Sequence, residues 1–153
     1  KISRYARDIA VDLGAKLVFV HVINKRNIIA LKHMKVYDSK ILSVDDYIGK
    51  LKRERTEKMQ KLIRETDCTN IPRKMVIRTG IPFIELIDCA EEEDVDIVIM
   101  VAKGRSDLAG ILFGSTAEKM FRRCPVPLLS IRERDIQKGG GALLRPLYIS
   151  PAH

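Results

Sequence analysis

Apolar residues along this chain alternate between two spacings, one typical of helices and one typical of buried strands. Residues Ile2–Leu13 carry apolar side chains at every third or fourth position, which predicts an amphipathic helix that ends at Gly14. Lys16–Ile23 is almost wholly apolar, as expected for a strand that is covered on both faces. The same change of spacing predicts further helices over Ser43–Thr66, over Pro82–Glu92 and from Thr116. It predicts further strands over Lys74–Arg78, Val95–Val101 and Val126–Ile131.

Helices and strands that alternate in this way indicate an α/β fold, because each crossover between parallel strands needs a connecting helix. We predict a doubly wound, Rossmann-like and mostly parallel sheet of five strands, flanked by about four helices. Ligands of such sheets lie at the carboxyl ends of the strands. Residues 24–42 show no sustained period and are interpreted as a long excursion between a strand and a helix.

The last part of the chain predicts one more strand, over residues 142–147. Residues 135–141 precede it, contain three consecutive glycines and are typical of a flexible linker. Ser150 and Pro151 then resemble a helix start, whereas the sequence from Lys1 resembles the inside of a helix. Read in the order 142–153 and then 1–10, these pieces would form a strand, a loop and a helix.

We therefore predict that residues 142–147 supply the first strand of the sheet, as in a circularly permuted chain. A single domain would then consist of residues 1–134 and 142–153, joined by the linker at 135–141. The hypothesis requires a central place for this strand and a short distance between His153 and Lys1.

Composition narrows the class of protein. The 153 residues suit one domain, and no apolar run approaches the roughly 18 to 20 residues of a membrane span. No signal-peptide pattern opens the sequence. Cys68, Cys89 and Cys124 are odd in number and lack CxxC spacing, so neither a disulfide framework nor a zinc site is indicated. We expect a cytoplasmic protein without a metal site.

The formal net charge of +8 favours acidic partners in general. The basic residues are interleaved with acidic ones, however, and aromatic residues amount to only 5%. This pattern is typical of solvated helix faces and argues against nucleic-acid binding.

A glycine-containing segment, Gly104–Thr116, lies between the strand at Val95–Val101 and the last predicted helix. Backbone N–H groups at a helix start lack helical partners, and the helix dipole gives them partial positive charge. Such segments bind phosphate in α/β proteins. Lys103 would add a full positive charge, so the sequence predicts a nucleotide-phosphate loop formed by Lys103, Gly104, Gly114, Ser115 and Thr116.

The spacing of Gly104, Gly114, Ser115 and Thr116 resembles the Gly-x2-Gly-x9-Gly-Ser/Thr signature of the universal stress protein family, in the adenine nucleotide alpha-hydrolase-like superfamily. The resemblance covers roughly residues 1 to 132. It implies a regulatory domain that binds ATP, ADP or AMP, with Mg²⁺ in the case of ATP. It also implies that Val22 and Met100 line the base or ribose, and that two copies pair as a homodimer through Val126–Ile131.

Two positions depart from the family's pattern. Val101 stands where nucleotide binders carry the first glycine of the signature, and a β-branched side chain there would hinder close approach of phosphate to the backbone. Nucleotide binders also carry a Pro-x-Asp-x-Ser pattern at the end of the first strand. The matching run is Pro146–Ser150, where Tyr148 replaces the Asp and so removes a charge-assisted acceptor for a ribose hydroxyl.

Three functions therefore compete. A nucleotide-binding switch needs an accessible loop site, whereas a homodimeric interaction module without nucleotide would use the glycines only for turns. A slow nucleotide hydrolase would need an acid–base group, and Asp107 is the only acidic residue within the loop. No Ser/His/Asp or Cys/His spacing predicts catalytic residues, and His21 is interpreted as structural. We expect at most a weak ATPase activity.

Overall fold

A computed structural model describes residues 2–29, 43–102, 115–132 and 147–150. Residues 25–29 are helical and follow directly on the first strand. The remaining elements, in chain order, are α1 (Ile2–Leu13), β1 (Lys16–Asn24), α3 (Val44–Glu65), the short 3-10 helix η1 (Cys68–Asn70), β2 (Arg73–Gly80), α4 (Pro82–Glu92), β3 (Ile97–Ala102), α5 (Ser115–Arg123), β4 (Leu128–Arg132) and β5 (Leu147–Ser150).

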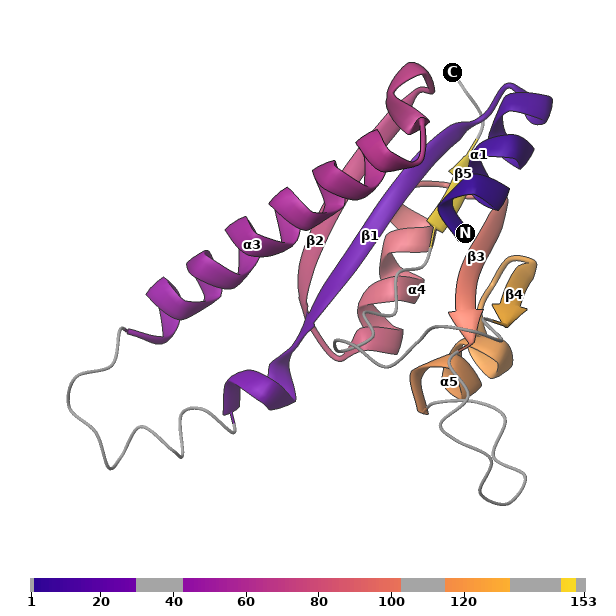
Figure 1. The fold of residues 1–153 in the computed structure, drawn as a ribbon. Helices are drawn as coiled ribbons and strands as arrows, with labels where there is room; N and C mark the ends of the chain where they lie inside the picture. Colours follow the sequence, from indigo (N-terminus) through magenta and orange to yellow (C-terminus); the bar gives the residue numbers. More distant parts are fainter. Residues whose placement is uncertain (1, 30–42, 103–114, 133–146, 151–153) are drawn as a thin grey trace.

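The strands form one five-stranded sheet in the order β2-β1-β5-β3-β4 (Figure 1). β1 pairs with β2 in parallel, and β3 pairs with β4 in parallel. β5 lies between the two pairs and is antiparallel to both of its neighbours. The predicted α/β fold with a doubly wound sheet is confirmed, with the difference that the sheet is mixed rather than wholly parallel.

The tail of the chain supplies the central strand, which the structure describes over Leu147–Ser150. Ser150 pairs with Lys16 at the amino end of β1, so β5 runs opposite to the direction of a parallel first strand. Residues 142–146, the predicted linker at 135–141 and both ends of the proposed permutation, Lys1 and His153, lie outside the described residues. The permutation and the domain bounds stay predictions.

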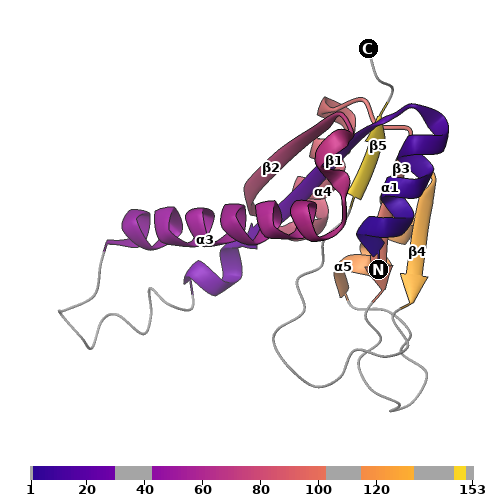
Figure 2. The same cartoon turned by 45° about the horizontal axis from the view of Figure 1, so that its top comes forward.

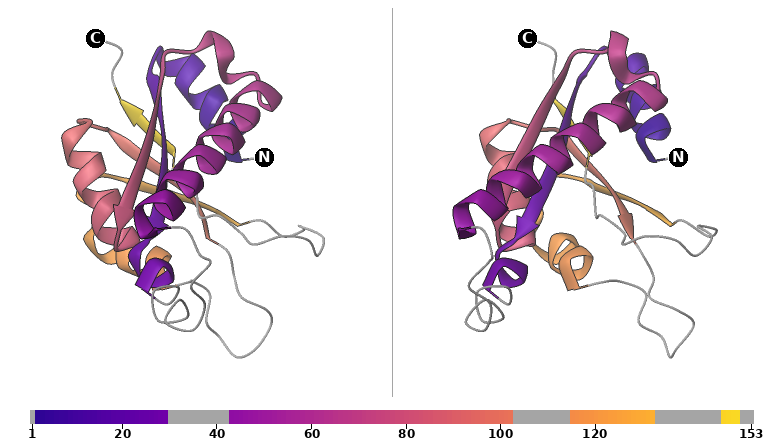
Figure 3. Two further views of the ribbon diagram at one scale, coloured as in Figure 1. Left: turned by 90° about the vertical axis from the view of Figure 1, so that its left-hand side faces the viewer. Right: turned by 60° about the vertical axis from the view of Figure 1, so that its left-hand side comes forward.

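Helices cover both faces of the sheet. On one face, α1 and α3 pack against alternate strand residues such as Leu17, Phe19 and Ile99. On the other face, α4 and α5 pack against the residues between them, such as Val18 and Val98. Figure 3 shows α3 and α4 on opposite sides of the strands. Apolar side chains on both faces explain why the strand sequences are nearly continuous apolar runs.

The long helix α3 packs on the sheet only through its last turns. Its buried residues are Met59 and Ile63, whereas its amino-terminal half extends away from the strands (Figure 2). The predicted start is confirmed, because the Ser43 hydroxyl accepts a hydrogen bond from the Asp46 N–H at 3.1 Å. A side-chain cap and acidic residues in the first turn stabilise a helix end that has few tertiary contacts.

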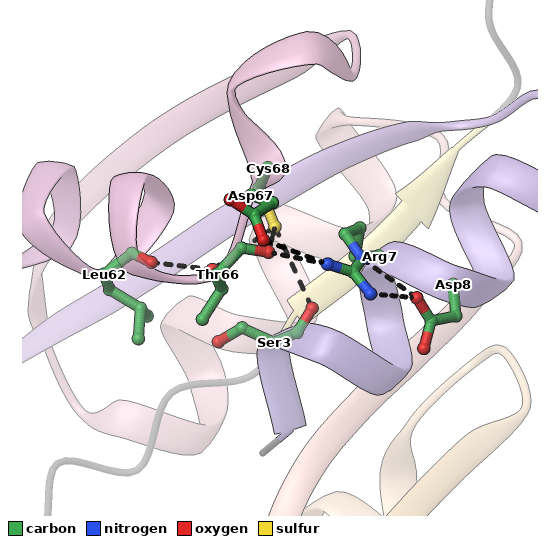
Figure 4. A network of polar contacts seen from close by, with 7 residues as sticks. All are labelled: Ser3, Arg7, Asp8, Leu62, Thr66, Asp67 and Cys68. Carbon is green, nitrogen blue, oxygen red and sulfur yellow. Dashed lines mark hydrogen bonds and ion pairs between the residues drawn. The ribbon is translucent and has the colours of Figure 1, made fainter.

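A polar network fixes α1 against the end of α3 (Figure 4). The Arg7 guanidinium donates to the Thr66 carbonyl at 3.4 Å and lies 3.5 Å from the Asp67 carboxylate. The Cys68 thiol is fully buried and contacts the Ser3 carbonyl at 3.9 Å. These contacts join α1 to the segment that leads into β2, so they hold the helix layer in place over the sheet.

Two glycines should respond in opposite ways to substitution by alanine. A Cβ atom on Gly80 would lie 2.7 Å from Cδ of Glu85, so Gly80→Ala forces this flexible, partly exposed side chain into another conformation and should cost about 0.5 to 1 kcal/mol. Gly49 lies inside α3 with no atom within 4 Å of the added Cβ. Gly49→Ala should therefore raise the free energy of unfolding by about 0.5 to 1 kcal/mol.

Urea denaturation of both variants measures these changes. Destabilisation by Gly49→Ala, or no effect of Gly80→Ala, would contradict the packing described for the two positions.

Candidate functional site

The candidate site lies at the edge of the sheet where β1 and β3 end. Both strands are antiparallel to β5, so their last residues, Asn24 and Ala102, lie toward the same edge. α5 begins at Ser115 near this edge, because it runs back across the sheet to the start of β4 (Figure 1). Strand ends and a helix start thus converge where doubly wound folds bind their ligands.

The ends of β1 and β3 and the start of α5 define the candidate site. Leu147, the first described residue of β5, lies opposite Phe19 of β1 and Ile99 of β3. From these positions β1 continues through Val20–Asn24 and β3 through Met100–Ala102 toward the site.

The structure places four of the seven predicted site residues. Val22 is half-buried at the end of β1, and Met100 is fully buried in the core between the sheet and the pair α4–α5. Ser115 is exposed and Thr116 half-buried in the first turn of α5. Lys103, Gly104 and Gly114 lie outside the described residues. The contacts of all seven with a ligand stay predictions.

Tyr148, which the sequence resemblance matched with the family's Asp, is part of the core. Its ring is fully buried on the face covered by α4 and α5, and its hydroxyl donates to the Leu86 carbonyl in α4 at 2.7 Å. Burial strongly raises the pKa of this phenol. The side chain consequently joins the central strand to α4 and offers no group to a ligand at the carboxyl edge.

Two cations of β2 form ion pairs with carboxylates of α4 and of its C-cap residue Glu93. The Arg78 guanidinium pairs with Glu92 through both nitrogens and lies 3.9 Å from Glu85. The hydrogen bond from Arg78 lowers the pKa of Glu92. Lys74 pairs with Glu93 at 2.6 Å. These ion pairs join the edge strand β2 to α4, so they stabilise the fold rather than provide charge for a phosphate.

Among the cysteines, Cys89 is fully buried on the inner face of α4, and burial raises the pKa of its thiol to about 11. Burial also raises the pKa of the half-buried Cys124 thiol. Both groups are therefore neutral near pH 7, and neither is a thiolate nucleophile. Within the residues that the structure describes, no group of three or more His, Cys, Asp or Glu side chains could hold a metal ion.

No helix in the described part of the chain is long and apolar enough to cross a membrane.

Comparison with known proteins decides the family. The model of the universal stress protein family matches residues 2–132, which is most of the chain. The chain belongs to the universal stress protein family. The predicted resemblance, which rested on the glycine spacing and on the order of strands and helices, is thereby confirmed.

Members from archaea are similar over most of their length. Universal stress protein MJ0577 of Methanocaldococcus jannaschii is 29% identical over 130 residues, which cover 78% of this chain and 78% of the relative. Universal stress protein MJ0531 of the same organism is 22% identical over 131 residues, which cover 86% and 73% respectively.

Solved structures of family members share the fold. The structure of MJ0577 aligns with a TM-score of 0.61 at 28% identity and covers 78% of this chain and 76% of that one. Universal stress protein UspA from Lactobacillus plantarum aligns with the same TM-score at 18% identity, covering 86% and 87%. At that identity the likeness concerns the fold alone.

Proposed function

We propose that this universal stress protein is a regulatory domain that binds ATP or a related adenine nucleotide at the carboxyl edge of the sheet. The observation that carries the proposal is the start of α5, with exposed Ser115 and half-buried Thr116, near the edge of the sheet at which β1 and β3 end (Figure 1). N–H groups of a first helical turn and the helix dipole favour a phosphate there. Gly104, Gly114 and Lys103 would complete the phosphate contacts.

Contacts with the phosphates would contribute more to the binding free energy of a nucleotide than contacts with the ribose. Tyr148 is committed to the Leu86 carbonyl, so it does not replace the carboxylate of the family's Asp. Val101 is a paired residue of β3, opposite Ile131 of β4. Backbone amides at the start of α5 and the Lys103 charge would then supply most of the binding free energy. For the same reason we expect ATP to bind more tightly than AMP.

A thermal-shift titration with ATP, ADP and AMP, each with and without Mg²⁺, tests the proposal. A ligand at about 100 times its Kd should stabilise the native state by roughly 2.7 kcal/mol, a readily measured rise in Tm. Gly114→Val should abolish the rise and leave the fold intact, whereas Gly49→Ala, in α3 and outside the glycine loop, should preserve it. No rise with any of the three nucleotides would contradict the proposal.

A homodimer through the last core strand is a second proposal, supported by the position of β4. Among the described strands it pairs with β3 alone, so it is an edge of the described sheet. Apolar side chains of β4 and α5 are exposed, with 38% of Leu129 and 44% of Phe121 accessible to solvent. Unpaired strand edges and apolar surface are what a second copy would cover.

The oligomeric state in solution tests the dimer. We expect the chain to elute as a dimer in size-exclusion chromatography with light scattering, and Leu129→Lys to elute as a monomer, because a buried unpaired charge disfavours the interface. The exposed substitution Arg122→Gln, outside the edge strand, serves as a control. A monomeric wild-type chain at micromolar concentration would contradict this proposal without affecting the nucleotide site.

A further inference from the structure

Two cations of α5 lie over one aromatic ring of α4. The Lys119 ammonium is 4.7 Å from the centroid of the Phe83 ring, and the Arg123 guanidinium is 5.4 Å from it. Both distances lie within the range of a cation–π interaction. Because they are measured from the same point, the two charges lie within roughly 10 Å of each other, about one Debye length at 0.1 M salt. A dissolved anion is therefore attracted by both charges together.

The described carboxylates in α5 and in the first turn of α4 are engaged by other groups. Glu118, the acidic residue of α5, pairs with Arg122 at 3.0 Å. Glu85, in the first turn of α4, lies against Gly80 and near Arg78. Within the part of the chain that the structure describes, neither Lys119 nor Arg123 forms an ion pair.

The Phe83 ring also orients the two cations before a ligand binds. Lys119 and Arg123 are both exposed to solvent, whereas Phe83 is half-buried and packs against the core cluster beneath α4 and α5. A ring fixed by the core restricts the orientation of the two long side chains, which reduces the entropy lost when they bind a ligand. The ring attracts each cation but leaves the net positive charge in place.

We propose that Phe83, Lys119 and Arg123 form an anion site between α4 and α5 that takes the phosphate groups of a small polyanion. A guanidinium matches two phosphate oxygens through its planar fork, and an ammonium adds a compact point charge. A chain of linked phosphates can contact both cations at once. This site uses none of the residues of the glycine loop, so it stands whether or not the loop binds a nucleotide.

Titration of the full chain with sodium tripolyphosphate in low-salt buffer, followed by calorimetry, tests the anion site. The double variant Lys119→Gln/Arg123→Gln should raise the Kd by at least about tenfold, equivalent to 1.4 kcal/mol. Arg122→Gln removes one cation of the same helix that is already paired with Glu118, and should change the Kd by less than about twofold. Phe83→Leu should weaken binding by an intermediate factor, because both cations lose their common support.

Two outcomes would overturn the site. If Arg122→Gln weakens tripolyphosphate binding as much as the double variant does, general charge and not the Phe83 ring attracts the anion. If the double variant binds as tightly as wild type, the three residues form no anion site. A loss of tripolyphosphate binding in Gly114→Val alone would place the phosphate at the glycine loop, which would support the nucleotide proposal and contradict this one.

Discussion

Tyr148→Ala is expected to lower the free energy of unfolding by about 3 to 5 kcal/mol, the usual cost of truncating a buried aromatic side chain. The ring is fully buried in the middle of the sheet, between Val18 of β1 and Val98 of β3. A cavity there would weaken the only strand that joins the two parallel pairs. Many domains are stable by only about 5 to 15 kcal/mol, so the variant would be close to unfolding at 37 °C. Urea denaturation followed by circular dichroism measures the change.

Tyr148→Phe measures the contribution of the hydroxyl to stability separately from that of the ring. It removes only the hydrogen bond to the Leu86 carbonyl and should cost about 1 kcal/mol. Equal losses for the two variants would mean that the hydroxyl, and not packing of the ring, holds β5 in place. If Tyr148→Ala were as stable as wild type, β5 would not be the central strand in solution.

The second large effect is expected for Met120→Ala, at about 2 to 5 kcal/mol. Met120 and Ala117 are the buried residues of α5, so they fix this nine-residue helix on the sheet. A poorly docked helix would also misplace Ser115 and Thr116 at its start. The variant should thus lose nucleotide binding, if the wild type has it, in proportion to the fraction of α5 that is displaced.

Arg122→Ala is the matched control for Met120→Ala. Arg122 lies on the same helix, but its side chain is exposed and, among the described residues, pairs with Glu118. Its removal should change the free energy of unfolding by no more than about 0.5 kcal/mol. Urea denaturation gives the stability of both variants, and the nucleotide titration gives their binding. A similar loss of stability in the two would contradict the docking described for α5.

Periodicity predicted most of the helices and strands, because a buried position imposes its spacing on the sequence. It missed the helical residues 25–29, which were interpreted as part of an irregular excursion. The central place of the tail strand was predicted from the two ends of the chain, which together resemble a strand, a loop and a helix. The direction of β5 was not predictable, since residues that alternate between two faces give the same pattern in a parallel and in an antiparallel strand. Direction depends on pairing with β1 and β3, which are remote in the sequence.

The roles of polar residues were harder to predict than the elements that carry them. A buried tyrosine needs a partner for its hydroxyl, but the sequence does not indicate that the partner is the Leu86 carbonyl. The ion pair of Arg78 with Glu92 likewise joins residues of different elements. Met100 was predicted from resemblance to line a ligand, and the fold adds that its side chain is fully buried.

The central place of β5 has a consequence for how the chain reaches its native state. β1 and β3 are synthesised well before their common neighbour, because β5 follows all other described strands in the sequence. Until Leu147–Ser150 leave the ribosome, the inner edges of β1 and β3 have no partner from this strand. Nascent chains with such exposed edges are prone to aggregate. Completion of the sheet should therefore be a late step in biosynthesis, and the interval before it should be when the chain depends most on chaperones.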